Sequence, residues 1–102
     1  MLKHHCHLPG CSTSCPPAHL FCAVHWRMVP ADIQTRVYDT VGRRGPQVDS
    51  SWAAWWRAQA DATQSVLRQL LKDSKDPKGQ LHRIERLKDR EDKFVAYLEA
   101  KL

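Results

Sequence analysis

The chain has 102 residues, with 16 Lys/Arg against 11 Asp/Glu, a net charge of +5 and four cysteines. This length predicts one small domain, and the moderate positive charge permits an acidic partner such as nucleic acid without requiring one. No apolar run approaches the ~20 residues of a membrane span, and no secretory signal follows the first residue, so we expect a soluble cytoplasmic protein.

Residues 1–29 are rich in Cys, His, Pro and Gly, a composition that predicts a compact knuckle with little regular structure. Cys6 and Cys11 bracket the turn sequence HLPG, and Cys22 and His25 have the spacing of a turn or the first turn of a helix. Four sulfur and nitrogen ligands suit a closed tetrahedral zinc site. We therefore predict Cys6, Cys11, Cys22 and His25 as ligands of a structural Zn²⁺.

Other residues of the same types compete for this role. Cys15 can replace Cys11, and His19 can replace His25, whereas the remaining histidines (His4, His5 and His7) are expected in a solvated tail. A disulfide pair is disfavoured by the absence of an export signal. A catalytic Cys–His site would need a third, orienting group that the sequence does not supply. Without paired carboxylates, a nucleophile motif or a phosphate loop, we expect no enzyme.

Three helices follow the knuckle. Pro30 and Asp32 suit the start of a short helix that Gly42 ends. Ser50 or Ser51 suits the N-cap of a second helix that runs to about residue 72. Asp76 and Pro77 then suit the start of a third, charged amphipathic helix, beyond a linker short enough to favour an antiparallel pair. We predict a mostly α fold, in which the zinc knuckle and short helix (1–48) carry a helical hairpin (49–102) as one unit.

The first half of the chain also carries a family likeness. The run CHLPGC, the later CAVHW and the proline before a short amphipathic helix resemble small, uncharacterised zinc-finger-like proteins of tailed phages and prophages. The matching positions are Cys6, Pro9, Gly10, Cys11, Pro16, Pro17, Ala18, Cys22, His25, Trp26 and Pro30. The resemblance covers about residues 6–60 and implies the same four ligands, with Cys15 at a non-ligand position. It implies a bacterial host cell but no activity.

Two kinds of partner are compatible with the sequence. Nucleic acid or a nucleoprotein is the first, bound through phosphate contacts from a basic patch of Arg27, Arg36, Arg43 and Arg44. The alternative is an inhibitor or adaptor of host defence, transcription or replication proteins, anchored by an exposed Trp55 or Trp56. Otherwise the tryptophans of SWAAWW pack the second helix against the knuckle.

The final helix also suits a homodimer, because its apolar stripe spans about three heptads. Glu91 falls near the seam of that stripe and weakens this prediction.

Overall fold

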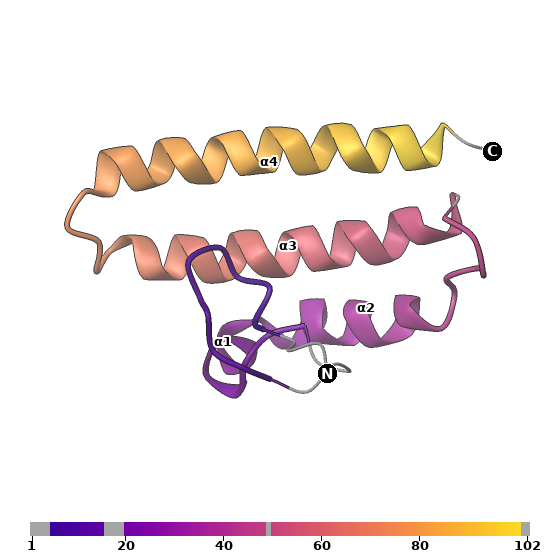
Figure 1. Ribbon diagram of the computed structural model, residues 1–102, viewed down its shortest axis with the longest axis horizontal. Helices are drawn as coiled ribbons and strands as arrows, with labels where there is room; N and C mark the ends of the chain where they lie inside the picture. The colour runs from indigo at the N-terminus through magenta and orange to yellow at the C-terminus, as the bar shows by residue number, and fades with distance from the viewer. Residues whose placement is uncertain (1–4, 16–19, 49, 101–102) are drawn as a thin grey trace.

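The computed structural model describes residues 5–15, 20–48 and 50–100, and within these ranges the chain is mostly helical. After the N-terminal knuckle come α1 (Ala23–Met28), α2 (Ala31–Val41), α3 (Ser51–Leu71) and α4 (Pro77–Glu99). Helix α3 packs against each of the other three helices, and Figure 1 shows it lying between α2 and α4. The predicted short helix and antiparallel helical pair are therefore confirmed.

The helix ends follow local sequence signals closely. Pro30 and Gly42 flank α2, and α4 starts at Pro77, where Asp76 Oδ1 accepts a hydrogen bond from the Gly79 amide at 3.2 Å. Ser50 is the N-cap residue of α3, as expected, but it makes no side-chain capping bond. Ser51 Oγ instead accepts from the Gly45 amide at 2.9 Å, which ties the preceding loop to the helix.

The larger hydrophobic cluster joins the knuckle to both long helices. Phe21 of the knuckle, Val66 of α3 and Ile84 of α4 are all buried in it, together with two of the cysteines. Apolar burial of this kind is the main favourable term in folding. The knuckle is therefore part of the core of the molecule and not an appendage. The members of the cluster are Cys6, Leu8, Phe21, Cys22, Val29, Ala62, Val66, Leu67 and Ile84.

A smaller cluster lies toward the other end of the α3–α4 pair. Val95 and Leu98 of α4 and Ala53 of α3 are buried there, and Trp52 and Trp56 pack against them. The interpretation that these tryptophans press α3 against the knuckle is wrong. Residues further along α3 (Ala62, Val66 and Leu67) make that contact. The two tryptophans instead pack where the N-terminal part of α3 meets the C-terminal part of α4.

Among the described residues, no helix is both long and apolar enough to cross a membrane.

Candidate metal centre

The first two predicted ligands lie on a tight loop. The Cys11 amide donates to the Leu8 carbonyl at 3.0 Å, and Gly10 has a φ of +88°, a conformation that side-chain-bearing residues rarely adopt. The Cys6 amide donates to the Thr13 carbonyl at 2.9 Å. These bonds fold the HLPG segment so that both thiols face the same point.

The other two ligands come from the start of α1. Cys22 is the N-cap residue of this helix, and its carbonyl accepts from the Trp26 amide at 2.9 Å. Residues three positions apart on a helix lie on the same face. His25 therefore points to the same side as Cys22, as expected for the first turn of a helix. A bond from the His7 amide to the Leu20 carbonyl at 2.8 Å holds the first loop against the segment that leads into α1.

The four predicted ligands converge on one point. Their ligand atoms all lie within 4.8 Å of one another, with Cys6 and Cys22 buried and the other two half-buried. His25 Nδ1 is 3.2 Å from Cys22 Sγ and 3.6 Å from Cys6 Sγ. In a tetrahedral zinc site with ordinary Zn–S and Zn–N bond lengths, the sulfur of one ligand lies about 3.6 Å from the nitrogen of another. This arrangement can hold a metal ion with only a small adjustment.

The surroundings of the thiols change their pKa values, which determine how readily they lose a proton to bind a metal. Burial raises the pKa of the Cys6 thiol to about 11, whereas hydrogen bonds from Thr13 lower the pKa of Cys11. The thiolate is the form that binds metals, so a bound cation must displace the Cys6 proton. The four cysteines form no disulfide with one another in the structure.

The competing residues have different surroundings. Cys15 does not belong to the convergent group. Burial raises the pKa of its thiol, and the nearby thiols of Cys22 and Cys11 raise it further. His4 and His19 lie outside the described residues. His5 pairs with Ser14 in an isolated β-bridge, and His7 Nδ1 lies 3.3 Å from Gln59 Nε2 of α3. His5 and His7 are exposed, as expected for solvated histidines, and these contacts connect their segment to the rest of the fold.

The four arginines of the predicted basic patch have different roles. Arg36 pairs with Asp61 at 2.7 Å, which links α2 to α3. The Arg44 guanidinium lies over the rings of Trp55 and Trp52, at 4.5 and 5.1 Å from their centroids. Such stacking is a cation–π contact that occupies the arginine within the molecule.

Arg27 and Arg43 are exposed, but they lie beyond opposite ends of α2. An eleven-residue helix is about 16 Å long, so the two ends of α2 are separated by about this distance. The role of these four arginines in nucleic-acid binding stays a prediction.

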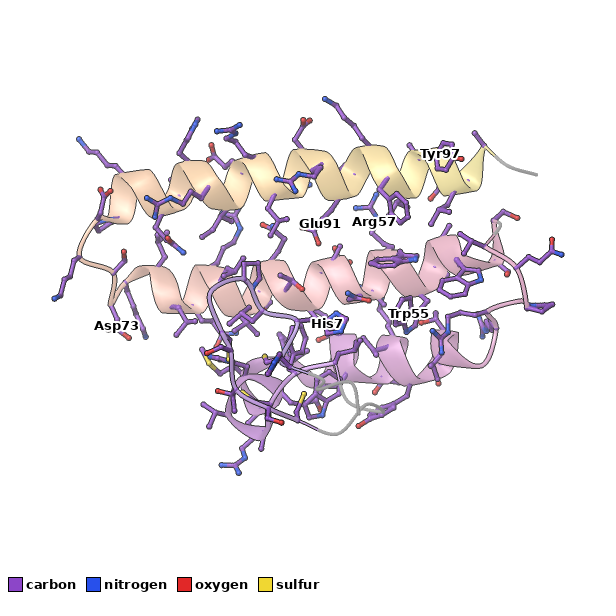
Figure 2. The ribbon with its side chains drawn as sticks, in the orientation of Figure 1. His7, Trp55, Arg57, Asp73, Glu91 and Tyr97 are labelled. Carbon is purple, nitrogen blue, oxygen red and sulfur yellow. The ribbon has the colours of Figure 1, made fainter. Side chains whose placement is uncertain are left out.

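Neither tryptophan proposed as an anchor is an exposed side chain. Trp55 is only 7% exposed, and Figure 2 shows it on the side of α3 that faces α2. Trp56 is half-buried, and its ring centroid lies 5.1 Å from that of Phe94 on α4. The role of either residue in partner binding stays a prediction.

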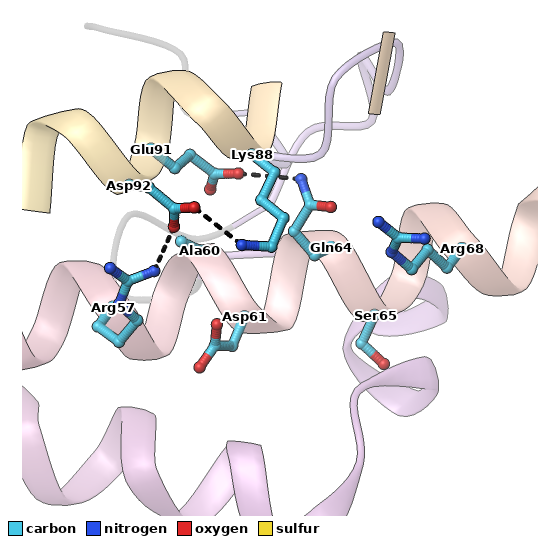
Figure 3. Close-up of a pocket in the computed structure, with 9 residues that line it drawn as sticks. All are labelled: Arg57, Ala60, Asp61, Gln64, Ser65, Arg68, Lys88, Glu91 and Asp92. Carbon is cyan, nitrogen blue, oxygen red and sulfur yellow. Dashed lines mark hydrogen bonds and ion pairs between the residues drawn. The ribbon is translucent and has the colours of Figure 1, made fainter. Parts of the chain in front are cut away.

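A polar cleft of about 240 Å³ lies between α3 and α4 (Figure 3). On its floor Gln64 Nε2 donates to Glu91 Oε1 at 3.1 Å, and at its rim Asp92 pairs with Arg57 at 2.6 Å and with Lys88 at 2.8 Å. Burial raises the pKa of Glu91. Of these two ion pairs, Arg57–Asp92 links α3 to α4, whereas Lys88–Asp92 lies within α4.

The outer face of α4 carries a feature that the sequence analysis did not single out. Arg86, Arg90 and Lys93, named here the α4 basic strip, are exposed and succeed one another at spacings of four and three residues. They line a shallow groove of about 460 Å³, together with His82, Glu85 and Asp89. Within the part of the chain that the structure describes, Arg86 and Arg90 have no ion-pair partner. Their spacing of four and three residues, which places them on one face of a helix, was the feature of the sequence that could have indicated this strip.

Comparison with protein-family models, curated proteins and solved structures gives no match to this chain. The chemistry of the residues themselves therefore carries the functional argument.

Proposed function

We propose that this chain is a zinc-stabilised, non-catalytic binding protein and that its partner is nucleic acid, alone or within a nucleoprotein. The observation that carries the proposal is the α4 basic strip, in which Arg86 and Arg90 present guanidinium groups that the described part of the protein does not neutralise. The metal centre provides the scaffold that supports the helices.

Zinc is the ion that suits this centre best. Three thiolates and one imidazole form one of the common ligand sets of structural zinc, whose four positions are all filled by the protein. An ion enclosed in this way has no position for a substrate or an activated water. Its contribution is therefore to folding, because ligands that are scattered in the unfolded chain are held together by the ion.

The charge distribution supports an acidic partner on α4. Arg36 and Arg44 are occupied within the fold, whereas the basic strip lies in a row along an exposed helix. A row of guanidinium and ammonium groups can contact successive phosphates and release condensed counterions. The ion pair of Lys93 with Asp89, at 3.0 Å, is highly exposed and therefore weak. Such contacts give affinity that depends on salt but carries little base sequence information.

The test is a binding titration with a pair of variants of equal charge. Arg86→Ala with Arg90→Ala removes two charges from α4, and Arg27→Ala with Arg43→Ala removes two exposed charges near α2. Using a fluorescein-labelled 12-nucleotide DNA strand at several salt concentrations, we expect the α4 variant to lose about fivefold or more in affinity and to flatten the salt dependence. The α2 variant should change affinity less than twofold.

Equal losses in both variants would contradict the assignment to α4. If the zinc-loaded wild-type chain binds no nucleic acid at low salt, the proposed function itself is wrong.

A protein partner is the second candidate, and a surface on α1 and α2 favours it. Val24 and Tyr38 are 64% and 65% exposed, which is high for large apolar side chains. If a host protein docks there, a complex isolated from host lysate should survive nuclease treatment and be lost in Tyr38→Ala. Loss of the complex on nuclease treatment would count against this candidate.

The resemblance of residues 6–60 to phage and prophage zinc-finger-like proteins supports a phage-type origin and a place in the bacterial cytoplasm. Self-association through α4 is less supported, because the buried positions of its apolar stripe (Ile84, Val95 and Leu98) already belong to the core clusters with α3.

A further inference from the structure

The last turns of α4 expose two aromatic rings beside the basic strip. Phe94 is 39% and Tyr97 55% exposed, and their rings are stacked, with centroids 6.4 Å apart and an interplanar angle of 27°. Figure 2 shows Tyr97 near the C-terminal end of α4. Two large aromatic side chains side by side on a charged helix form a distinct surface.

This aromatic pair is anchored from below. The Phe94 ring meets the Trp56 ring edge-on at 5.1 Å, and Trp56 contacts Trp55 in the same manner at 5.1 Å. Trp56 also packs against the buried cluster that contains Val95 and Leu98. The exposed rings are therefore the outer end of a continuous series of ring contacts, which restricts the orientation of Phe94 before any partner binds. Preorganisation of this kind reduces the entropy lost on binding.

Basic side chains flank the pair. Phe94 lies four residues after Arg90, and Tyr97 lies four residues after Lys93, so each ring shares a helix face with one cation. From Arg86 to Tyr97 this surface extends about 16 Å along the helix. An exposed aromatic pair that continues a row of cations is the combination by which proteins hold single-stranded nucleic acid, since bases stack on rings while phosphates meet cations.

We propose that Phe94 and Tyr97 form a stacking platform for the unpaired bases of single-stranded nucleic acid, with Arg90 and Lys93 contacting the adjacent phosphates. The inference rests on the proposed function and adds to it a preference for single-stranded over double-stranded nucleic acid. In a duplex the faces of the bases are covered by their neighbours, so the platform discriminates between the two forms. The face of every base is a π-system, so the selectivity is for single strands and not for a sequence.

Tyr38 provides a matched control for Tyr97. Both are exposed tyrosines on helices, but Tyr38 lies on α2, away from the α4 basic strip. The probes are a labelled 12-nucleotide DNA strand, the RNA of the same sequence and the corresponding DNA duplex, each titrated with the full, zinc-loaded chain. We expect the single strands to bind at least about fivefold more tightly than the duplex.

Tyr97→Ala should lose at least about fivefold in affinity for the single strands and less than twofold for the duplex. Tyr97→Phe, which keeps the ring and removes the hydroxyl, should retain the wild-type affinity, and Tyr38→Ala should not differ from the wild type. Zinc content and the circular dichroism spectrum establish that each variant is folded.

The outcomes separate this inference from the function on which it rests. If the wild-type chain binds no nucleic acid, both fail. If binding depends on Arg86 and Arg90 but is unchanged in Tyr97→Ala, or if single strand and duplex bind equally, only the stacking platform is overturned. It is also overturned if sedimentation shows a dimer that Tyr97→Ala dissociates while affinity for the single strand is unchanged, because the rings would then serve an interface between two copies of the chain.

Discussion

The metal centre shows how much depends on a few side chains. Cys6 and Cys11 are separated from Cys22 and His25 by a segment that includes Cys15, yet the four ligand atoms converge within 4.8 Å. Cys6 and Cys22 are also members of the hydrophobic cluster. Loss of either thiol would therefore affect both the proposed ion and the packing around it.

Replacing Cys22 tests the ligand set. We expect Cys22→Ser to lose bound zinc and to lower the free energy of unfolding by several kcal/mol, because the binding energy of a structural ion is largely folding energy. Cys15→Ser is the matched control, which should keep one zinc per chain and melt within a few degrees of the wild type. Elemental analysis and thermal denaturation measure both. A zinc-free Cys15→Ser protein would show that the ligand set is misassigned.

The long helices are connected by polar as well as apolar contacts. Gln64 of α3 donates to Glu91 and, at 3.2 Å, to the Ile84 carbonyl, while Arg57 pairs with Asp92. Figure 2 shows Glu91 and Arg57 in the space between α3 and α4. A partly buried carboxylate in this position is costly unless it is protonated or well paired.

Glu91 makes the stability of the helical hairpin depend on pH. Burial raises its pKa above the ordinary value of 4.5, so above that pH the folded chain binds more protons than the unfolded chain. The free energy of unfolding therefore falls as the pH rises from the unfolded-state pKa of Glu91 to its folded-state pKa. Above the folded-state pKa, the full cost of burying the charged carboxylate is present. We expect Glu91→Gln, which keeps the acceptor for Gln64, to raise the Tm by about 2–4 °C at pH 7.5.

The gain should disappear below about pH 4, where the wild-type side chain is protonated in both states. Thermal melts of the two proteins at matched pH give the difference directly, so any effect of acid on the metal centre cancels. Glu85→Gln, on the exposed outer face of α4, is the control and should change the Tm by less than a degree or so. A gain that is independent of pH would show that burial of the charge is not its cause.

At the scale of the whole molecule, the knuckle and the hairpin share one core. The larger cluster brings Cys6, Phe21 and Cys22 together with Val66 and Ile84, and α3 contacts α1, α2 and α4. The metal centre is consequently coupled to residues that lie far from it in the sequence.

Metal removal should therefore destabilise the entire chain. With a zinc chelator in excess we expect the Tm to fall by about 10 °C or more, and the melts followed by helical circular dichroism and by tryptophan fluorescence should shift together. Adding back zinc should restore the wild-type melt, which controls for irreversible damage. An unchanged helical melt after complete metal removal would mean that the hairpin is stable without the knuckle.

The sequence by itself determined the features that depend on neighbouring residues. Pro30, Gly42 and Asp76 mark helix ends because fixed backbone angles and capping bonds act within a few positions. The ligand group was predictable for the same reason, since each pair of ligands is close in sequence and has chelating spacing.

Only the tertiary structure decided which charged and aromatic side chains are paired or buried and which are exposed. Arg36 and Arg44 resemble Arg86 and Arg90 in the sequence, but Arg36 pairs with Asp61 of another helix, and Arg44 lies over tryptophan rings of α3. Likewise, Trp55 is buried on the side of α3 that faces α2, whereas Tyr97 of α4 is exposed. Exposure and pairing depend on contacts between elements, and a pattern of neighbouring residues does not contain them.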